Sequence, residues 1–474
     1  MQKLSCGLLT FILSTTAVWA DVTVKNDSNT DLALSIYSNT ALVRDVRQVN
    51  LPSGKSSVLF AGVAAQMKPE TLIVNGSGFT VHEQNYNFAM LSPENVARAN
   101  KGKIVKTVIW DDEKAKNIYD KARVLDVYAG RPVLQFGYGI EFDFPGRIIW
   151  ENLPDNLQTE PSLSLGVEAR EGGNKSLGLM YLTDGMKWST NYVAEFAGED
   201  ELNLKAWISI NNTSGISYHN ARVQVVAGEA NLVYQPRMAR PAMMKAMAVM
   251  DNAVGFAESA PMPTEESVGE YHVYSLPEKI TIDDNQTKQI SLLSKDRIKY
   301  QKEYRLSSPL YLGIGSQGGE FKKANTDVFV KMVNDKDSHL GEPLPQGVIR
   351  FYDRDSYGNM LFVGESHFRQ LAFGDDTELR IGRSFDVTAS GQIINLKKIA
   401  DKTIEADVKV IFNNAKSNAV QVQFEQSLNN DWHILSESLE GQKKDARHMK
   451  WLVDVPAQGN AELNFKVRIV KADA

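Results

Sequence analysis

The feature that most constrains this chain is the alternation of apolar and polar residues over many short segments. In the segment LNLKAWISI, every second position is apolar: Leu202, Leu204, Ala206, Ile208 and Ile210. A period of two places these side chains on one face of a β-strand. Similar segments recur along the chain, separated by clusters of Gly, Asn, Asp and Pro that are typical of turns between strands. The sequence therefore predicts an all-β fold with β-sandwich regions and few short helices.

Two segments have the pattern of strand pairs joined by tight turns. Residues 32–60 alternate around a Pro-Ser-Gly turn, and residues 177–198, LGLMYLTDGMKWSTNYVAEFAG, alternate around Asp184-Gly185. An Asp-Gly pair favours a two-residue hairpin loop. The sequence predicts a hairpin in the second segment. The final third repeats the pattern in GVIRFYD, MLFVGE, TIEADVKVIFNN, AVQVQFEQSL, MKWLVDV and AELNFKVRIV.

One segment predicts a helix, and the segment after it is ambiguous. Residues 92–100 begin with Ser92 as a cap, Pro93 at the first helical position and Glu94 at the positive end of the helix. Residues 103–150 contain the helix-forming run DDEKAKNIYDKAR between segments that favour strands. Because the strand signals are stronger than propensity alone, we expect a small barrel-like insert within an N-terminal β domain.

The first twenty residues have the pattern of a secretory signal peptide. Lys3 is the only charged residue before Asp21, an apolar run extends from Gly7 to Val18, and small residues precede a cleavage point after Ala20. The apolar run is too short to span a bilayer permanently. We therefore expect a periplasmic or secreted mature chain. The single cysteine, Cys6, would leave with the signal peptide, which excludes disulfides and thiolate sites from the mature protein.

The charge distribution and hydropathy exclude two classes of protein. The 52 basic and 58 acidic residues give a net charge of −6, and they are interspersed without a basic run. Nucleic acid is therefore not an expected partner, because phosphate binding needs clustered Lys and Arg. No segment after the signal peptide reaches about 18 consecutive apolar residues, so we expect no transmembrane span in the mature chain.

Common catalytic and ligand motifs do not occur. The sequence has no G-x-S-x-G, S-x-x-K or H-E-x-x-H motif, and its seven histidines are dispersed. GIGSQG at 313–318 lacks the strand and helix of a dinucleotide site, and DRDSYGN at 353–359 fits a hairpin tip better than a calcium loop. We therefore expect no catalytic residues, no metal site and no cofactor.

Two features are candidates for binding. Four methionines, Met243, Met244, Met247 and Met250, would cluster on a helix within the stretch MARPAMMKAMAVM. Such a helix could bind a partner protein, copper(I) or a membrane surface, but the flanking Pro, Ala and Glu favour a low-complexity linker. Trp207 falls on the opposite strand face from the aliphatic row of its segment, which makes it a candidate for a binding surface.

Several longer segments together resemble a known bacterial family. They are YLTDGMKWSTNYVAEF, ISINNTSGISYHNARVQVVAG, LPQGVIRFYDRD, LRIGRSFDV and WLVDVPAQGNAELNFKVRIV. In combination they resemble the family called domain of unknown function 4139, which is related to mucoidy-inhibitor-like proteins. The resemblance runs from about residue 165 to the end, and ALVRDVRQVNLPSGKSSVLFAGVA is similar to the usual N-terminal portion. It implies a β-rich exported protein with an insertion, and it supplies no catalytic residues.

These observations lead to a domain plan and to three functional hypotheses. We expect a signal peptide at 1–20, an N-terminal β domain at 21–164, and a family-type β-sandwich domain at 165–474 that a Met/Ala/Pro-rich insertion interrupts at 236–268. The leading hypothesis is an exported, non-enzymatic binding or scaffold module of the cell envelope, with an envelope protein or a glycan as its partner. The alternatives are a hydrolase of envelope polymers, which needs paired carboxylates about 5–10 Å apart, and methionine-based periplasmic copper binding.

Overall fold

The fold is all-β, as the alternation predicts. A computed structural model describes residues 20–25, 31–87, 92–151, 160–228 and 262–471. Within these residues the only helices are α1 (Pro93–Ala99) and the single 3-10 turn η1 (Pro69–Thr71). The predicted signal peptide up to residue 19 and the methionine stretch lie outside the described residues. No helix among those described is both long enough and apolar enough to cross a membrane.

Contacts divide the chain into two compact units, and neither is continuous in sequence. One comprises Met1–Trp188, Ile210–Leu232 and Val273–Lys288, and the other comprises Ser189–Ser209, Val233–His272 and Gln289–Ala474. The predicted boundary between residues 164 and 165 falls inside strand β12 (Ser162–Ala169), which pairs along its whole length with both of its neighbours in the sheet. The end of the predicted insertion also differs, since residues 264–268 form a strand.

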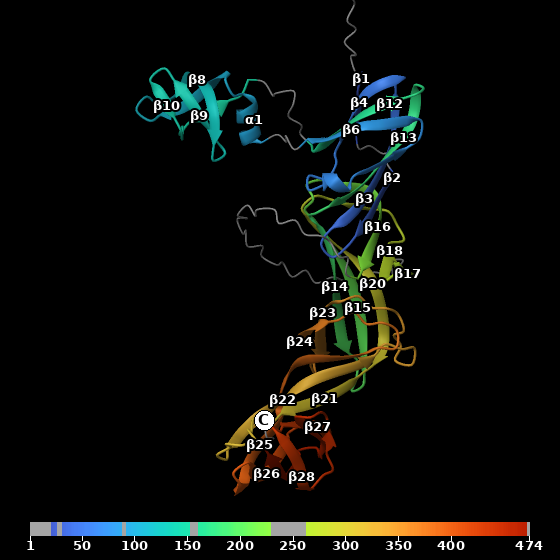
Figure 1. The fold of residues 1–474 in the computed structure, drawn as a ribbon, viewed down its shortest axis with the longest axis vertical. Coiled ribbons are helices and arrows are strands. Elements are labelled where there is room, and N and C mark those ends of the chain that lie inside the picture. The colour runs from blue at the N-terminus through green and yellow to red at the C-terminus, as the bar shows by residue number, and fades with distance from the viewer. Residues whose placement is uncertain (1–19, 26–30, 88–91, 152–159, 229–261, 472–474) are drawn as a thin grey trace, which may run out of the picture. The chain divides into compact units, whose positions relative to one another are not determined.

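Two sheets hold the N-terminal strands (Figure 1). The first has the order β1 (Ala20–Val24), β4 (Gly54–Ala61), β12 and β6 (Phe79–Asn87). The second has the order β17 (Thr264–Val268), β18 (Tyr271–Ser275), β16 (Tyr218–Ala227), β2 (Asp31–Ile36), β3 (Ala41–Leu51), β13 (Gly173–Thr183) and β5 (Ile73–Gly76), and β19 (Ile280–Ile282) also pairs with β16.

A buried ion pair joins these two sheets. Arg47 and Asp45 on β3 lie with their nearest charged atoms 2.6 Å apart, and both side chains are almost fully buried. The Arg47 guanidinium also donates to the carbonyl oxygens of Val24 and Ala61, on β1 and β4, and it lies 3.9 Å from the centre of the Phe60 ring. A single side chain therefore satisfies backbone groups on the sheet opposite its own strand.

The turn at Asp184-Gly185 connects two strands that belong to different sheets, so the predicted hairpin is wrong. Strands β13 and β14 (Met186–Phe196) flank Asp184-Gly185, yet β13 pairs with β3 while β14 lies in another sheet. Gly185 has a φ of +80°, and Thr213 donates its backbone N–H to the Gly185 carbonyl. Burying the apolar faces of both strands in a sandwich overrides the local preference for a hairpin.

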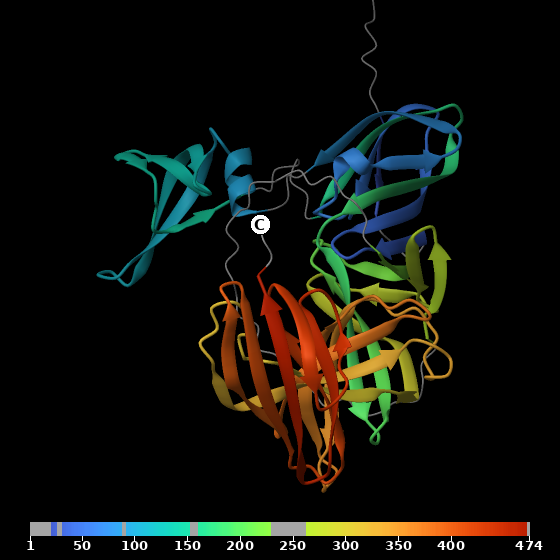
Figure 2. The ribbon, with the colours of Figure 1, turned by 60° about the horizontal axis from the view of Figure 1, so that its bottom comes forward.

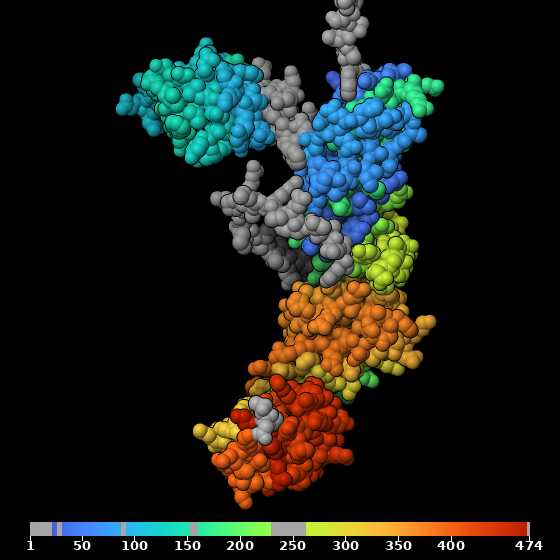
Figure 3. Space-filling view, viewed as in Figure 1, coloured from blue at the N-terminus to red at the C-terminus, as the bar shows by residue number. Residues whose placement is uncertain are grey.

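The segment from Pro93 to Trp150 is a small β module, which we call the insert (Figure 3, cyan). Its sheet has the order β10 (Gly139–Glu141), β9 (Arg131–Phe136), β8 (Lys116–Tyr128), β7 (Ile104–Asp111) and β11 (Arg147–Ile149). The predicted helix is confirmed as α1, with Ser92 accepting a hydrogen bond from the Asn95 backbone at 3.1 Å. The ambiguous run DDEKAKNIYDKAR is not helical, as expected: it forms the turn between β7 and β8 and the first part of β8. The barrel-like closure is not found, because the edge strands β10 and β11 are short and do not pair with each other.

The remaining strands form two further sheets. One has the order β20 (Gln286–Lys299), β15 (Glu201–Asn212), β14, β23 (Gly347–Arg354) and β24 (Met360–Phe368). The other has the order β28 (Asp431–Glu437), β31 (Gly459–Val470), β26 (Thr403–Asn414), β25 (Asp376–Ala400), β22 (Glu320–Val333), β21 (Gln301–Ser307), β27 (Val420–Ser427), β30 (His448–Val455) and β29 (Gln442–Lys443). The C-terminal strands lie side by side in this last sheet (Figure 2, orange and red).

A core of aromatic side chains holds the nine-stranded sheet together. Trp451 on β30 is fully buried and stacks on Phe465 of β31 at 4.7 Å between ring centres. Phe424 of β27 lies 5.9 Å from Trp451 and 5.6 Å from Phe412 of β26. The core therefore joins strands that are distant in the strand order, as in a β-sandwich.

Three asparagine side chains form the same set of hydrogen bonds where strands end. The side-chain amide of Asn212 donates to the carbonyls of Ile216, Ile282 and Asp283. Asn334 and Asn414 each donate to three carbonyls in the same way. All three side chains are almost fully buried. Because each buried amide group donates to several carbonyls at once, it fixes the turns where strands end.

Candidate binding site

Of the predicted site residues, only Trp207 lies within the part of the chain that the structure describes. Trp207 on β15 is half-buried and alternates with a fully buried aliphatic row, so its predicted face is confirmed. Its role in binding stays a prediction. Met243, Met244, Met247 and Met250 lie outside the described residues. The predicted hairpin tip at 353–359 is confirmed, since the Asp355 carboxylate accepts the backbone N–H groups of Tyr357 and Asn359.

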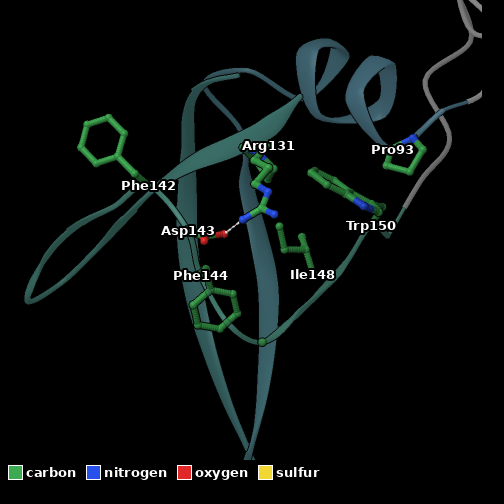
Figure 4. Close-up of a pocket in the computed structure, with 9 residues that line it drawn as sticks. Pro93, Arg131, Phe142, Asp143, Phe144, Ile148 and Trp150 are labelled. Carbon is green, nitrogen blue, oxygen red and sulfur yellow. Dashed lines mark hydrogen bonds and ion pairs between the residues drawn. The ribbon is translucent and has the colours of Figure 1, made fainter. Parts of the chain in front are cut away.

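A pocket in the insert is the candidate site that the structure adds (Figure 4). Its volume is about 460 Å³, which lies in the usual range for small-ligand sites. The lining is largely apolar and aromatic and comes from α1, β9 and β11 and from the segment between β10 and β11: Pro93, Arg131, Pro132, Phe142, Asp143, Phe144, Gly146, Ile148 and Trp150. The residues thus come from both ends of the insert sequence.

The apolar part of the pocket is built on the core of the insert. Phe144, Ile148 and Trp150 are partly buried and pack against the buried cluster that includes Phe136. The rings of Phe136 and Phe144 are 5.2 Å apart between centres. Figure 4 shows the Trp150 ring beside Pro93, the first residue of α1. These side chains are held by packing, so the apolar wall exists before any ligand binds.

The turn before β11 needs a glycine for this arrangement. A Cβ atom at Gly146 would lie 2.4 Å from the Val108 carbonyl oxygen and 2.4 Å from the Phe144 ring. Such distances are far below van der Waals contact, so any larger residue would displace Phe144 or the edge strand. Gly146 therefore lets the chain turn closely over β7 while Phe144 stays in the wall.

The polar part of the pocket is an exposed ion pair. An Arg131 guanidinium nitrogen is hydrogen-bonded to Asp143, and both side chains are more than half exposed. Figure 4 shows the pair between the Phe142 and Ile148 side chains. A guanidinium has five donors and a carboxylate has several acceptor positions, so the pair retains unused donors and acceptors. The site therefore presents hydrogen-bond donors and acceptors in a pocket that aromatic side chains also line.

The pocket contains a single carboxylate. Asp143 is the only acidic residue in the lining, and it is paired with Arg131. The paired carboxylates that the hydrolase hypothesis requires are not in this pocket. Among the described residues, no group of three or more His, Cys, Asp or Glu side chains is placed to hold a metal ion. The Arg131–Asp143 pair is the charged group that this pocket offers to a ligand.

The sequence contains a weak signal for the pocket. The stretch FDFPGRIIW, residues 142–150, combines aromatic residues with Pro and Gly, and it supplies most of the lining. Its alternation indicates a strand, but alternation does not show which distant segment a strand faces. The contribution of Arg131 and Pro93 becomes visible only from the fold.

Comparison with known proteins leaves the family open. No protein-family model matches the chain, and no curated protein matches it at a significant level. The resemblance to domain of unknown function 4139 stays a prediction.

Proposed function

We propose that this protein is an exported, non-enzymatic binding module of the cell envelope and that the pocket of the insert binds a glycan. The observation that carries the proposal is the exposed Arg131–Asp143 pair in a pocket that the aromatic side chains of Phe144 and Trp150 also line. Export is supported by the signal-peptide pattern of the first twenty residues. The resemblance to domain of unknown function 4139 is part of the proposal, because it implies an exported β-rich protein.

The chemistry of a saccharide matches both parts of the pocket. A sugar hydroxyl donates one hydrogen bond and accepts others, so neighbouring hydroxyls can donate to Asp143 and accept from Arg131. The C–H face of a sugar ring is apolar and can pack on an aromatic side chain, whose ring offers a large flat surface. An ordinary apolar ligand would leave the ion pair unused, and a free anion would leave the aromatic wall unused.

The test is the affinity of the mature chain, residues 21–474, for chitotriose, cellotriose and maltotriose. Titration calorimetry measures binding, and tryptophan fluorescence reports on Trp150 in the pocket wall. The decisive variant is Arg131→Ala/Asp143→Ala, which removes donor and acceptor while keeping the net charge. Because hydrogen bonds to charged groups contribute about 1.5–3 kcal/mol, we expect the affinity to fall at least about tenfold.

A second ion pair of the insert supplies the matched control. Lys101 and Asp126 are 2.8 Å apart and exposed, and neither residue lines the pocket. Lys101→Ala/Asp126→Ala likewise removes one cation and one carboxylate and should leave glycan binding unchanged. Equal loss in both double variants would show a general effect on the insert, and absence of binding to every glycan would overturn the proposal.

A further inference from the structure

The face of the insert's sheet that lies opposite the insert core, which we call the outer face, has an unusual composition. The strand registers place Ile104, Arg123, Gln135 and Ile140 in one row across β7, β8, β9 and β10. Directly opposed residues of antiparallel strands project from the same face of the sheet. The next rows hold Lys121, Lys106 and Ile149, then Tyr119, Val108 and Arg147, and then Asn117 and Trp110.

Five large apolar side chains of the outer face are exposed. Ile104, Trp110, Tyr119, Ile140 and Ile149 are each at least 40% accessible to solvent. Isolated apolar residues are common on protein surfaces, but a group of them on one sheet face marks an interaction site. The core of the insert does not need these side chains, because its apolar cluster lies on the other face of the sheet.

The charges of the outer face are mainly positive. Lys106, Lys121, Arg123 and Arg147 project from it. Lys106 is paired with Glu151 at 2.8 Å, and Asp126, opposite Val133, is paired with Lys101. The hydrogen bond with Glu151 raises the pKa of Lys106, so this lysine is protonated at neutral pH. The positive excess contrasts with the net charge of −6 of the whole chain.

This combination matches the interface of an anionic bilayer. Tryptophan and tyrosine concentrate at the boundary between headgroups and hydrocarbon, and isoleucine gains free energy only by leaving water. Lysine and arginine beside them attract anionic headgroups and can extend their charged ends to the phosphates. A glycan would not remove the three isoleucines from water as effectively, since saccharide surfaces are covered with hydroxyl groups.

We propose that the outer face of the insert binds the surface of a bilayer that contains anionic phospholipid. Trp110, Tyr119 and Ile104 enter the headgroup region, and Lys121 and Arg123 contact lipid phosphates. The positively charged part of the outer face ends at the turn of the β7–β8 hairpin, where the chain carries the acidic residues Asp112 and Glu113. This proposal goes beyond glycan binding and does not depend on the pocket.

The test is flotation of the mature chain, residues 21–474, with two kinds of vesicle. One contains phosphatidylglycerol and phosphatidylcholine, and the other contains phosphatidylcholine alone. We expect binding to the anionic vesicles, loss of binding as salt screens the charges, and a blue shift of tryptophan emission. Equal binding to both vesicles would overturn the electrostatic part of the proposal.

Two sets of variants assign the binding to the outer face. Lys121→Glu/Arg123→Glu should weaken binding at least about 25-fold, because each basic residue near an anionic surface contributes about fivefold. Lys397→Glu/Lys398→Glu, at exposed positions of β25, is the control with the same charge change and should bind as the unchanged chain. Trp110→Ser should also weaken binding, and Phe385→Ser, at another exposed aromatic position, should not. Circular dichroism verifies that each variant is folded.

The outcomes separate this proposal from glycan binding. Loss of vesicle binding in the outer-face variants with unchanged glycan affinity supports two independent sites. Glycan binding without any vesicle binding overturns the bilayer proposal and leaves the pocket proposal standing. Equal binding to soluble dextran sulfate, unaffected by Trp110→Ser, would reveal a general polyanion surface and would also overturn it.

Discussion

Replacing Arg47 by methionine should destabilise the N-terminal strands more than any change on the protein surface. The substitution removes the cation that is paired with Asp45, whose side chain is 3% exposed. It also removes donors from the carbonyls of Val24 and Ala61. Methionine fills much of the same volume, so the loss is mainly electrostatic.

The size of the expected loss in stability follows from the burial of both charged side chains. Burial raises the pKa of Asp45, and hydrogen bonding and attraction to Arg47 oppose this effect. Removing one partner of a buried pair typically costs about 3–5 kcal/mol, because the remaining charge loses its compensation. Arg47→Met should therefore lower the free energy of unfolding by about this amount. Asp45→Leu/Arg47→Met should recover part of the loss, since no charge remains buried, while the two carbonyls still lack donors.

Amide hydrogen exchange of the mature chain is the appropriate assay, because it measures opening free energies of β1, β3 and β4 separately. Arg44→Met is the matched control. Arg44 lies on the same strand and pairs with Asp31 at 3.2 Å, but both side chains are exposed. Loss of this exposed pair should lower the free energy of unfolding by less than about 1 kcal/mol. Similar losses for Arg47→Met and Arg44→Met, or no recovery in the double variant, would refute the reasoning.

Three further predictions concern the other unit. Asn414→Ala should lower stability by about 1–3 kcal/mol in urea unfolding, because the carbonyls of Asn418, Val455 and Pro456 lose a donor. Gly364→Ala should cost at least about 1–3 kcal/mol in the same assay, since its Cβ would lie 1.9 Å from the Ile381 carbonyl oxygen. A hydrogen bond from Arg305 lowers the pKa of Glu378 below its usual value of 4.5. The stability that the Arg305–Glu378 pair contributes is therefore complete above pH 4.5 and is lost as the pH falls through the lowered pKa of Glu378. Glu378→Gln should therefore cost less than about 1 kcal/mol at pH 7, and its melting temperature should approach that of the unchanged chain in acid.

Local pattern predicts the strands well, because period-two alternation is a property of each segment by itself. The aliphatic row of β15 and the cap of α1 follow from neighbouring residues alone. Partner choice depends on packing between distant segments, so the turn at Asp184-Gly185 was predictable but the separation of β13 from β14 was not. The buried positions of Asp45 and Arg47 also run against residue preference, because charged residues are rarely buried unless they are paired.

The candidate site was less predictable than the fold. The pocket joins Pro93, Arg131 and Trp150, which are separated by most of the insert, and no motif connects them. The outer face could be inferred only after the register was known, because a shift by one residue would exchange its side chains with those of the core. Trp207 illustrates the limit, since its face was correctly predicted while its function stays a prediction.

The interleaving of the two units has a consequence for biogenesis. The first unit needs Val273–Lys288, and the second combines Ser189–Ser209 with residues up to the C-terminus. Neither unit can be completed during the early part of chain synthesis. β14 pairs with β23, whose residues follow more than 150 positions later. Such distant pairings form slowly, and unpaired strands remain exposed in the meantime. The proposed export requires the chain to cross a membrane unfolded, and this design delays premature folding. After export the chain would depend on protection from aggregation until its last strands arrive.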